Sequence, residues 1–582
     1  MKIKLDPEQI FQEYEDGKTY NNTIELDTNV EKNERFFIGD QWAGVNAPNL
    51  MKPVFNLVKR VTTYFVAMMV TDDISVHITP FNDSKEMTAQ AHIIERELSE
   101  VIEKTKLKAK TRTAIKNCCV DGDTDMFVSF NPDLDTGMTY KGDIENQIID
   151  NTNIIFGNPY SSDVQSQPYI LIIQKLFTDQ VKDYAEECGC KNLDDIVSDN
   201  DADFVSNTMA NNNGSTDNLT TVITKLWKEK RTVKKKDKFG LEYEEEVKTV
   251  KYMKCTRKVV IKKNTDLGYK LYPVAHMTWE PVKQSYHGRS PITGLIPNQI
   301  FINKMFAMCM VYMTNMGFPK IFYDTNKLKQ YTNDVTKANG IANIDLLGKV
   351  IDAAKAPDFS SQVMELIDKT ISYTKDFMGA SDAALGNINN PDNTSAIVAV
   401  QQASAVPLEI QRLAFYDYIE DIVRICIDVM AEDYGTRTVK ITPQEAEDIG
   451  AMEPVLNQYG QAQIDQNTNQ VMMQAKDSIE LDNSVLKGSN YKMNVEIGQS
   501  TYWSETTQIQ TMDNLFTKGI ITDAVTYLES IPDKYIPNKS KIIDEIKQKQ
   551  EQQEQLSNLQ NIASSMGVSS NAKALLSVPT NS

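Results

Sequence analysis

The sequence has few histidines and no recognisable catalytic cluster. Its 582 residues include only four histidines, at positions 77, 92, 276 and 287. None stands in a His-x-Glu or His-Glu-x-x-His arrangement, so each is expected to be a structural or surface residue. Gly17-Lys18-Thr19 would suit a phosphate-binding loop, but Gln12 occupies the position where that motif needs another glycine. We therefore expect no active site and no cofactor, and the protein is not predicted to be an enzyme.

The chain also lacks an excess of positive charge. It has 61 lysines and arginines against 80 aspartates and glutamates, which gives a formal net charge of −19. A free-standing protein that binds duplex DNA usually carries a basic patch large enough to neutralise several phosphates. The composition argues against that class, although an acidic protein can still let DNA slide past without holding it.

Disulfides, metal sites and membrane spans are not indicated. The seven cysteines are odd in number and widely scattered, which favours a reducing environment. Cys188-Gly-Cys190 could supply half of a metal site, but no second Cys/His pair stands at zinc spacing. The most apolar helical stretch, residues 305–313, is far shorter than the roughly 20 residues that cross a bilayer. The first residues contain no apolar segment typical of a secretory signal.

The length of the chain allows two to four packed units. Residues 1–60 indicate a polar arm and a compact motif, Arg35-Phe-Phe-Ile-Gly-Asp-Gln-Trp42, followed by Pro53 and Asn56. Periodicity then predicts a buried helix at 54–70, a strand at 74–79, a long helix at 83–120 ended by Gly122, and strands at 126–130, 143–149 and 154–156.

Residues 220–279 again have a β pattern and contain blocks of opposite charge. Residues 225–238 are strongly basic, whereas residues 242–246 are acidic. Facing each other on a hairpin, the two blocks would neutralise one another. A solvated hairpin with cross-strand charge pairs is therefore favoured over a nucleic-acid-binding patch for residues 225–263.

The second half has a different order of elements. A helix at 298–316 is apolar on almost all faces and so requires burial by neighbours. It is followed by short β segments at 321–323 and 344–350, a helix at 362–378, a polar loop at 384–394, a long helix at 395–434, strands at 438–442 and 492–497, and helices at 505–530 and 540–560.

Several segments, taken in order, resemble the portal proteins of tailed bacteriophages. The first are Arg35–Trp42 with Pro53 and Asn56, and the strand Ile74-Ser-Val-His-Ile-Thr-Pro80. His287-Gly-Arg-Ser-Pro-Ile and the helix after it are also similar to the family. Later matches are Leu385-Gly…Asn393-Thr-Ser-Ala396 with Gln401-Gln-Ala-Ser-Ala, and Asn494-Val-Glu-Ile-Gly-Gln-Ser-Thr-Tyr-Trp503. The resemblance covers roughly residues 33–540 and rests on the order of the motifs.

The resemblance implies an α+β portal fold, with an α/β wing, a two-helix stem, a small β-containing clip, a long wing-crossing helix and a C-terminal helical crown. The implied boundaries are 1–290 for the N-terminal arm and wing, 291–318 for the first stem helix, 319–360 for the clip, 361–384 for the second stem helix, 385–396 for the tunnel loop, 397–435 for the long wing helix, 436–504 for returning wing strands, and 505–582 for the crown and a mobile tail. The basic hairpin and the Gln-rich tail depart from the family's pattern.

The same resemblance implies a function at the capsid vertex of a virion, after assembly in the host cytoplasm. Portal subunits form a homo-oligomeric ring, usually of twelve, through which double-stranded DNA is packaged and ejected. The implied partners are terminase, head-completion and tail proteins and the major capsid protein, with no membrane. Two alternatives stay open: another virion structural protein without a DNA channel, and a nucleic-acid enzyme that grips its substrate with the basic hairpin.

Candidate site residues follow from the same resemblance. The tunnel loop would place uncharged side chains against DNA, namely Asn387, Asn389, Asn390 and Asn393. Lys369 and Lys375 on the second stem helix would add weak basic rings. The competing interpretation is that the asparagines serve a turn and that the lysines are solvated.

Overall fold

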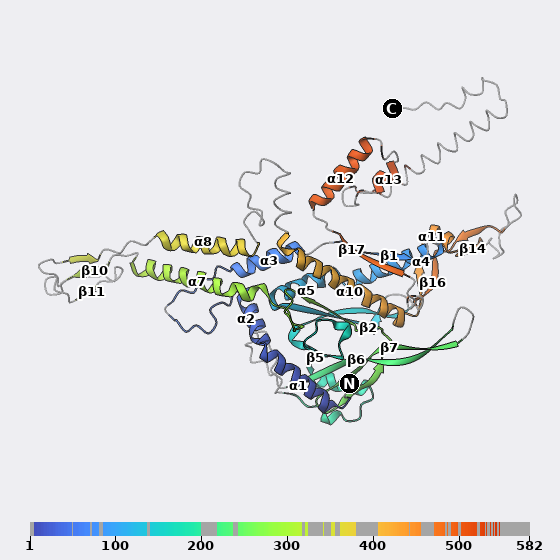
Figure 1. Ribbon diagram of the computed structural model, residues 1–582, viewed down its shortest axis with the longest axis horizontal. Helices are drawn as coiled ribbons and strands as arrows, with labels where there is room; N and C mark the ends of the chain where they lie inside the picture. Colours follow the sequence, from blue (N-terminus) through green and yellow to red (C-terminus); the bar gives the residue numbers. More distant parts are fainter. Residues whose placement is uncertain are drawn as a thin grey trace, which may run out of the picture. The chain divides into compact units, whose positions relative to one another are not determined.

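A computed structural model of the chain describes residues 5–48, 50–69, 73–80, 85–136, 140–199, 218–236, 242–316, 320–323, 341–342, 351–354, 361–379, 406–441, 443–455, 471–483, 486, 491–498, 502–518, 520, 524–529, 531, 536, 539, 542–543 and 546. Two compact units divide the chain, Met1–Gly498 and Gln499–Ser582. Helices and antiparallel strands are mixed in the first unit (Figure 1), which confirms the α+β class. Among the described helices, none combines the length and the apolar character that a bilayer span requires.

The N-terminal segment forms helices rather than an extended polar arm. These are α1 (Pro7–Thr23), α2 (Leu26–Ile38) and, after the compact motif, α3 (Leu57–Met69). The sequence did not predict that one face of α1 is buried, because the helix is rich in polar residues. One of its buried contacts joins two charged side chains. The Glu13 carboxylate lies 2.5 Å from the Lys225 ammonium, and both side chains are almost fully buried. This ion pair fixes α1 to the strand that carries Lys225.

The long helix predicted for residues 83–120 is two helices, α4 (Lys85–Lys104) and α5 (Leu107–Asp121). The chain turns at Lys106, whose φ of 52° lies in the left-handed region. Gly122 ends α5 with a φ of 108°, as the sequence predicted. A side chain at Gly122 would also collide with the backbone of Gly288, so both geometry and space require glycine there.

Two antiparallel sheets form the middle of the first unit. The smaller has the order β3-β2-β9, from Lys141–Ile149, Asp123–Asp135 and Val274–Thr278. The larger has the order β4-β5-β6-β7-β8. Its strands are β4 (Ile154–Phe156), β5 (Tyr169–Phe177), β6 (Leu219–Lys236), β7 (Glu242–Cys255) and β8 (Val260–Asp266). The helix α6 (Thr178–Glu187) lies beside this sheet. The predicted strands at 126–130, 143–149 and 154–156 are therefore confirmed.

The outer part of β6 and β7 is a two-stranded ribbon with opposed charges. Lys234 pairs in register with Glu244, and Lys236 pairs with Glu242. The Lys230 ammonium lies 2.7 Å from the Glu246 carboxylate. These pairs confirm the prediction of cross-strand neutralisation.

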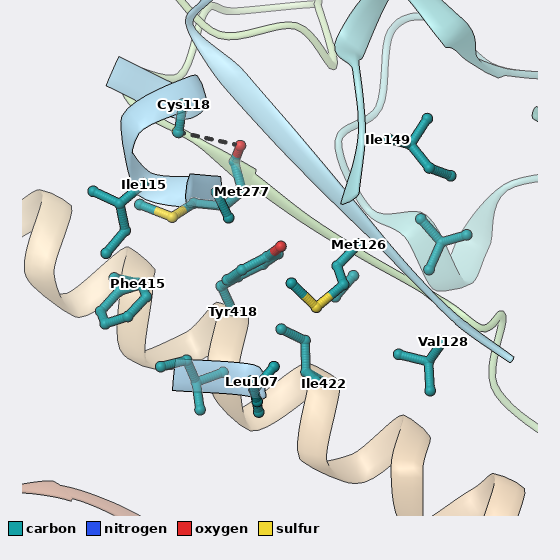
Figure 2. Packing of buried hydrophobic residues seen from close by; sticks show 14 of the residues in the cluster. Leu107, Ile115, Cys118, Met126, Val128, Ile149, Met277, Phe415, Tyr418 and Ile422 are labelled. Atoms are coloured by element: carbon teal, nitrogen blue, oxygen red, sulfur yellow. Dashed lines mark hydrogen bonds between the residues drawn. The ribbon is translucent and has the colours of Figure 1, made fainter. Parts of the chain in front are cut away.

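The main core lies between the smaller sheet and α10 (Glu409–Asp433). Figure 2 shows Phe415, Tyr418 and Ile422 of α10 facing Met126 of β2 and Ile115 of α5. All five side chains are buried. α10 lies far along the chain from β2, so the core around β2 is complete only when α10 packs against it.

Later strands return to the first unit. β13 (Thr436–Lys440) pairs with β16 (Ser478–Asp482), β14 (Met452–Pro454) pairs with β15 (Met473–Ala475), and α11 (Pro443–Asp448) lies between β13 and β14 in the sequence. β1 (Asp73–Pro80) pairs antiparallel with β17 (Tyr491–Gly498), which confirms the strands predicted at 74–79 and 492–497.

The second unit has two described helices, α12 (Tyr502–Thr517) and α13 (Ala524–Glu529), where a single helix over 505–530 was predicted. The rings of Phe516 and Tyr527 stack with centroids 4.6 Å apart and join the two helices. The helix predicted at 540–560 lies mainly outside the described residues.

Two buried histidines lie beside carboxylates of β2, where the sequence predicted structural or surface residues. His276 Nδ1 is 2.9 Å from Asp125 Oδ1, and Nε2 is 2.9 Å from the carbonyl oxygen of Tyr286. His287 Nδ1 is 2.7 Å from Asp123 Oδ2. The ligand atoms of Asp123, Asp125 and His276 lie within 4.8 Å of one another. Both ring nitrogens of His276 face acceptor oxygens, however, so they donate protons and the arrangement fits a charged ion pair better than a metal site.

The environment of His276 changes its protonation. Burial alone lowers its pKa, but the charge and the hydrogen bond of Asp125 raise it more, and the resulting pKa is about 9. Burial raises the pKa of Asp125, against the effect of the positive His276. The ordinary pKa of histidine is about 6.5. Because the folded-state pKa of His276 is above that value, its stabilising contribution is complete below about pH 6.5 and is lost as the pH rises through about 9.

We expect this ion pair to dominate the pH dependence of stability on the alkaline side. The wild-type midpoint of thermal denaturation should fall between about pH 6.5 and 9, by the equivalent of up to about 3 kcal/mol. His276→Gln should lower the midpoint most below about pH 6.5, where the contribution is complete, and should flatten its fall in this window. His92→Gln is the control, because the His92 side chain is 60% exposed. An H276Q profile parallel to the wild type would contradict the assignment.

Candidate functional site

Two long helices extend side by side from the first unit (Figure 1) and carry a small sheet at their far end. They are α7 (Pro291–Met316) and α8 (Ser361–Phe377). The Asn298 amide donates a hydrogen bond to Thr374 Oγ1 at 3.2 Å and links the helices near the core. Both predicted helices are confirmed, although α7 begins seven residues earlier than expected and continues through Pro297.

The small sheet contains three short strands. β10 (Lys320–Tyr323) pairs antiparallel with β12 (Ile351–Ala354) and parallel with β11 (Ile341–Ala342). The predicted segment 321–323 lies on β10, whereas residues 344–350 lie outside the described residues. A helix, a small sheet and a returning helix therefore follow one another, as the sequence predicted.

The root of α7 is held by hydrogen bonds to the end of α5. Ser290 Oγ donates to the carbonyl oxygen of Cys119 at 2.7 Å and accepts from the amide of Ile292 at 3.1 Å. A side chain at Gly288 would collide with the carbonyl oxygen of Gly122. The His287-Gly-Arg-Ser-Pro segment is therefore a structural junction, which explains its residue types.

Buried amides attach α7 to α3. Gln299 is 1% exposed, and its Oε1 accepts hydrogen bonds from the amides of Leu57 and Val58, at 2.8 and 3.4 Å. Its Nε2 donates to Phe55 O and to Asn303 Oδ1, each at 2.9 Å. A side chain of α7 thus satisfies the first amides of α3, which have no partner within their own helix.

The amide chain continues into the motif at residues 35–42. The Asn303 amide donates to Gln41 Oε1 at 2.6 Å, and Gln41 donates to the carbonyl oxygen of Phe36 at 2.9 Å. Trp42 Nε1 donates to Pro53 O at 2.9 Å. This motif is evident in the sequence, whereas its link to α7 was not predicted. The signal was present, because glutamine and asparagine at positions 299 and 303 interrupt an otherwise apolar helix.

α8 packs through one stripe, as its periodicity predicted. Ile367 and Thr374 are buried, and Val363, Ile371 and Met378 are half-buried along the same stripe. Lys369 is exposed and its ammonium lies 2.8 Å from the Glu365 carboxylate. Lys375 is half-buried.

The helix pair carries no net charge. Its cationic side chains are Lys304, Lys369 and Lys375, and its carboxylates are Glu365, Asp368 and Asp376. The described residues of α7 carry one charged side chain in all. A long element with so few charges attracts phosphate weakly.

Large apolar side chains of the pair are exposed in the single chain. Met308 and Met313 on α7 are 65% and 70% exposed, and Tyr373 and Phe377 on α8 are 58% and 89% exposed. Their number explains why α7 appeared apolar on most faces in the sequence. Contiguous apolar exposure of this kind marks an interaction surface.

The polar loop at 384–394 cannot be placed from the part of the chain that the structure describes. Asn387, Asn389, Asn390 and Asn393, and the whole segment 385–396, lie outside the described residues, as does most of 319–360. The long helix predicted for 395–434 is described from residue 409 onward, as α10, and Gly435 follows its end.

Comparison with known proteins gives one result. A family model described as the phage P22-like portal protein matches residues 25–566. The matched segment covers nearly the whole chain and includes α7, α8 and the small sheet. No curated protein matches the chain.

We expect Gln299→Ala to destabilise the protein through unsatisfied buried groups. The change removes the side-chain acceptor of the Leu57 and Val58 amides and the donor to Asn303 Oδ1, which costs about 2–4 kcal/mol. The midpoint of thermal denaturation, measured at fixed protein concentration, should fall by several degrees. Gln12→Ala is the matched control, because the Gln12 amide bonds Asp16 on an exposed face. Equal midpoints for the two variants would contradict the anchoring role.

Proposed function

The chain belongs to the P22-like family of phage portal proteins, and on this basis we propose that it is one subunit of a ring through which DNA enters and leaves the capsid. The family is structural and non-enzymatic, and its members form oligomeric rings at the capsid vertex of the virion. The finer assignments that follow are ours. The observation that carries them is the helix–sheet–helix extension of α7, β10–β12 and α8, with its low charge and exposed apolar side chains.

The α7–α8 pair is the proposed wall of the channel. DNA of any sequence must slide through, and each neutralised phosphate adds affinity and resistance to movement. A pair without net charge keeps this attraction small. Lys369 and Lys375 would add basic rings of low strength, because Glu365 lies against Lys369 and Lys375 is half-buried.

Neighbouring subunits are the proposed cover for the exposed apolar residues. A ring needs two different faces on each subunit, so that one face of a copy meets the other face of the next. Met308 and Met313 on α7 and Tyr373 and Phe377 on α8 supply apolar area for such contacts. Twelve copies is the number that the resemblance implies.

Other segments take the family's remaining functions in this proposal. The sheet β10–β12, within the clip at 319–360, would dock terminase and later the head-completion and tail proteins. The loop at 385–396 would bring Asn387, Asn389, Asn390 and Asn393 to the DNA, whose phosphates uncharged amides hold weakly. The wing would meet the major capsid protein, and residues 505–582 would form the crown.

Two other functions are less well supported. A nucleic-acid enzyme gripping its substrate with the hairpin 225–263 is disfavoured, because glutamate positions of β7 stand in register with lysine positions at the end of β6. A virion structural protein without a channel would share the fold class and the acidity. The presence of an axial opening in the assembled particle separates that alternative from a portal.

We expect the purified chain to form closed rings with a central hole in negative-stain class averages. Met308→Lys with Met313→Lys should reduce the fraction of rings at least about tenfold, because two side chains worth roughly 1.5–3 kcal/mol each would be replaced by charges. Met472→Lys with Met473→Lys is the control, since these methionines are 46% and 49% exposed away from the helix pair. A chain that stays monomeric, or assembles without an opening, would refute the proposal.

Deletion of residues 386–393 tests the loop separately. We expect normal rings in class averages but a loss of packaged or retained DNA of at least about tenfold, if the loop acts on DNA rather than on assembly. Packaging is measured as nuclease-protected DNA per particle, with the undeleted chain as the reference. Wild-type levels of protected DNA would remove the asparagine loop from the mechanism.

A further inference from the structure

The chain between α2 and α3 exposes large apolar side chains beside α7 (Figure 1). Val45, Met51, Val54 and Phe55 are 42%, 55%, 38% and 49% exposed in the single chain. We call these four side chains the apolar loop. Neighbouring apolar residues that are exposed together mark an interaction surface.

The apolar loop is held firmly on α7. The rings of Phe55 and Phe306 lie with their centroids 4.2 Å apart. The carbonyl oxygen of Phe55 accepts a hydrogen bond from Gln299 Nε2 at 2.9 Å, and the Lys52 ammonium donates to the carbonyl oxygen of Val45 at 2.8 Å. The loop therefore keeps its shape in the single chain and would lose little conformational entropy when it is bound.

α7 exposes a second apolar position on the side opposite the apolar loop. Met308 is 65% exposed. A helix has about 3.6 residues per turn, so Met308 lies roughly half a turn around α7 from both Gln299 and Phe306. Gln299 and Phe306 are the residues that hold the loop. Met308 therefore points away from it.

α8 has three distinct faces. One stripe contains Ile367 and Thr374, which are buried. A second stripe, about 100° around the helix, contains Leu366, Tyr373 and Phe377, which are 49%, 58% and 89% exposed. The charged residues lie on the other side of the buried stripe, namely Glu365, Asp368, Lys369, Lys375 and Asp376. An exposed stripe from which charge is absent has the composition of an interface core.

The exposed stripe of α8 lies on the same side of the helix pair as Met308. The two helices run in opposite directions (Figure 1), and the hydrogen bond between Asn298 and Thr374 fixes which faces meet. When α7 is viewed along its axis with Gln299 upward, Asn298 and hence α8 lie to one side, and Met308 points down. Because the direction of α8 is reversed, its exposed stripe also points down. We call this surface the apolar flank, formed by Met308, Leu366, Tyr373 and Phe377.

We propose that the apolar loop of one subunit packs on the apolar flank of the next copy of the chain. This inference rests on the proposed ring and names the two faces that the ring requires. A cyclic ring needs two complementary surfaces on different sides of each subunit, whereas an unrelated partner would need only one. Ring formation is a property of the family to which the chain belongs. None of the eight side chains is charged, so their contact desolvates no ion.

The height of the two faces along the helix pair decides which residues meet. Rotation about the axis of a ring keeps every residue at its own height, and in the proposed channel that axis runs along α7 and α8. Phe306, which contacts the loop, is eight residues after Asn298, and Leu366 is eight residues before Thr374. The Asn298–Thr374 bond therefore brings Phe306 and Leu366 level. Met308 is about 3 Å further along, so the loop is expected against Met308 and Leu366 of the next copy.

Engineered cysteines test this contact in assembled rings. The test chain carries Met51→Cys with Met308→Cys. The control chain carries Met472→Cys with Met308→Cys, because Met472 is 46% exposed away from the helix pair. Cys188→Ser removes the exposed native thiol from both, and a chain with this change alone gives the background. A short bifunctional maleimide is added to rings that class averages show to be closed, and the products are separated on a denaturing gel.

We expect the test chain to give a ladder of covalent oligomers, because each copy is joined to both of its neighbours. The control chain and each single-cysteine chain should stay monomeric, since a loop meets no loop and a flank meets no flank. Met51→Cys with Leu366→Cys is the second pair, and it serves if the change at Met308 impairs assembly. Independently, Met51→Lys with Val54→Lys should reduce the fraction of rings at least about tenfold.

Closed rings that give no ladder with either cysteine pair would overturn the contact and leave the loop to a different protein of the particle. Dimers formed by Met51→Cys alone would also overturn it, because loops would then meet each other. In both cases the rings persist, so the proposed function stands. Absence of rings from the unsubstituted chain would instead refute the proposed function, and this contact with it.

Discussion

The close approach of Gly122 and Gly288 is the constraint on which the rest of the structure depends. At this point the end of α5, the start of β2 and the segment before α7 come within contact distance, and a side chain at either glycine would separate them. Ser290 and the His287–Asp123 pair add polar bonds across the same junction. The direction of the α7–α8 pair is fixed because the start of α7 is held at this junction. Main-chain crowding therefore sets the geometry of the junction, and the buried hydrogen bonds stabilise it.

Periodicity predicted most elements of this fold but not their connections. The helix at 362–378 and the strands of β2–β4 were predicted correctly because one buried face sets a clear spacing. The helix at 298–316 was predicted from its apolar residues, which lie on almost all faces. The split between α4 and α5 was missed, since lysine at position 106 gives no signal of a left-handed turn. The polar α1 was missed because Glu13 is buried against Lys225, a contact between residues far apart in the chain. The same limit applies to the site: Gln299 and Gln41 are ordinary residues until the fold connects them through Asn303. The asparagine loop was found by resemblance alone.

Lysine residues occupy three different environments in this acidic chain. Lys225 is buried and forms an ion pair with Glu13. The lysines at the end of β6 stand in register with glutamates of the neighbouring strand β7. Lys106 and Lys108, at the start of α5, are exposed. Net charge describes none of these environments. In the proposed portal subunit, the location of each cation would decide where DNA is attracted and where it moves freely.

The pairing of β1 with β17 has a consequence for biosynthesis. β1 is made early, yet its partner strand ends at Gly498. At synthesis rates of 5–20 residues per second, the early strand waits roughly 20 to 80 seconds for that partner. Throughout this interval the nascent polypeptide keeps an open strand edge, and α10, which completes the main core, is also still to come for most of it. The first unit cannot complete its fold before almost all of the chain has been synthesised. Truncated products would thereby be kept out of the finished particle, a form of quality control that arises from strand order alone.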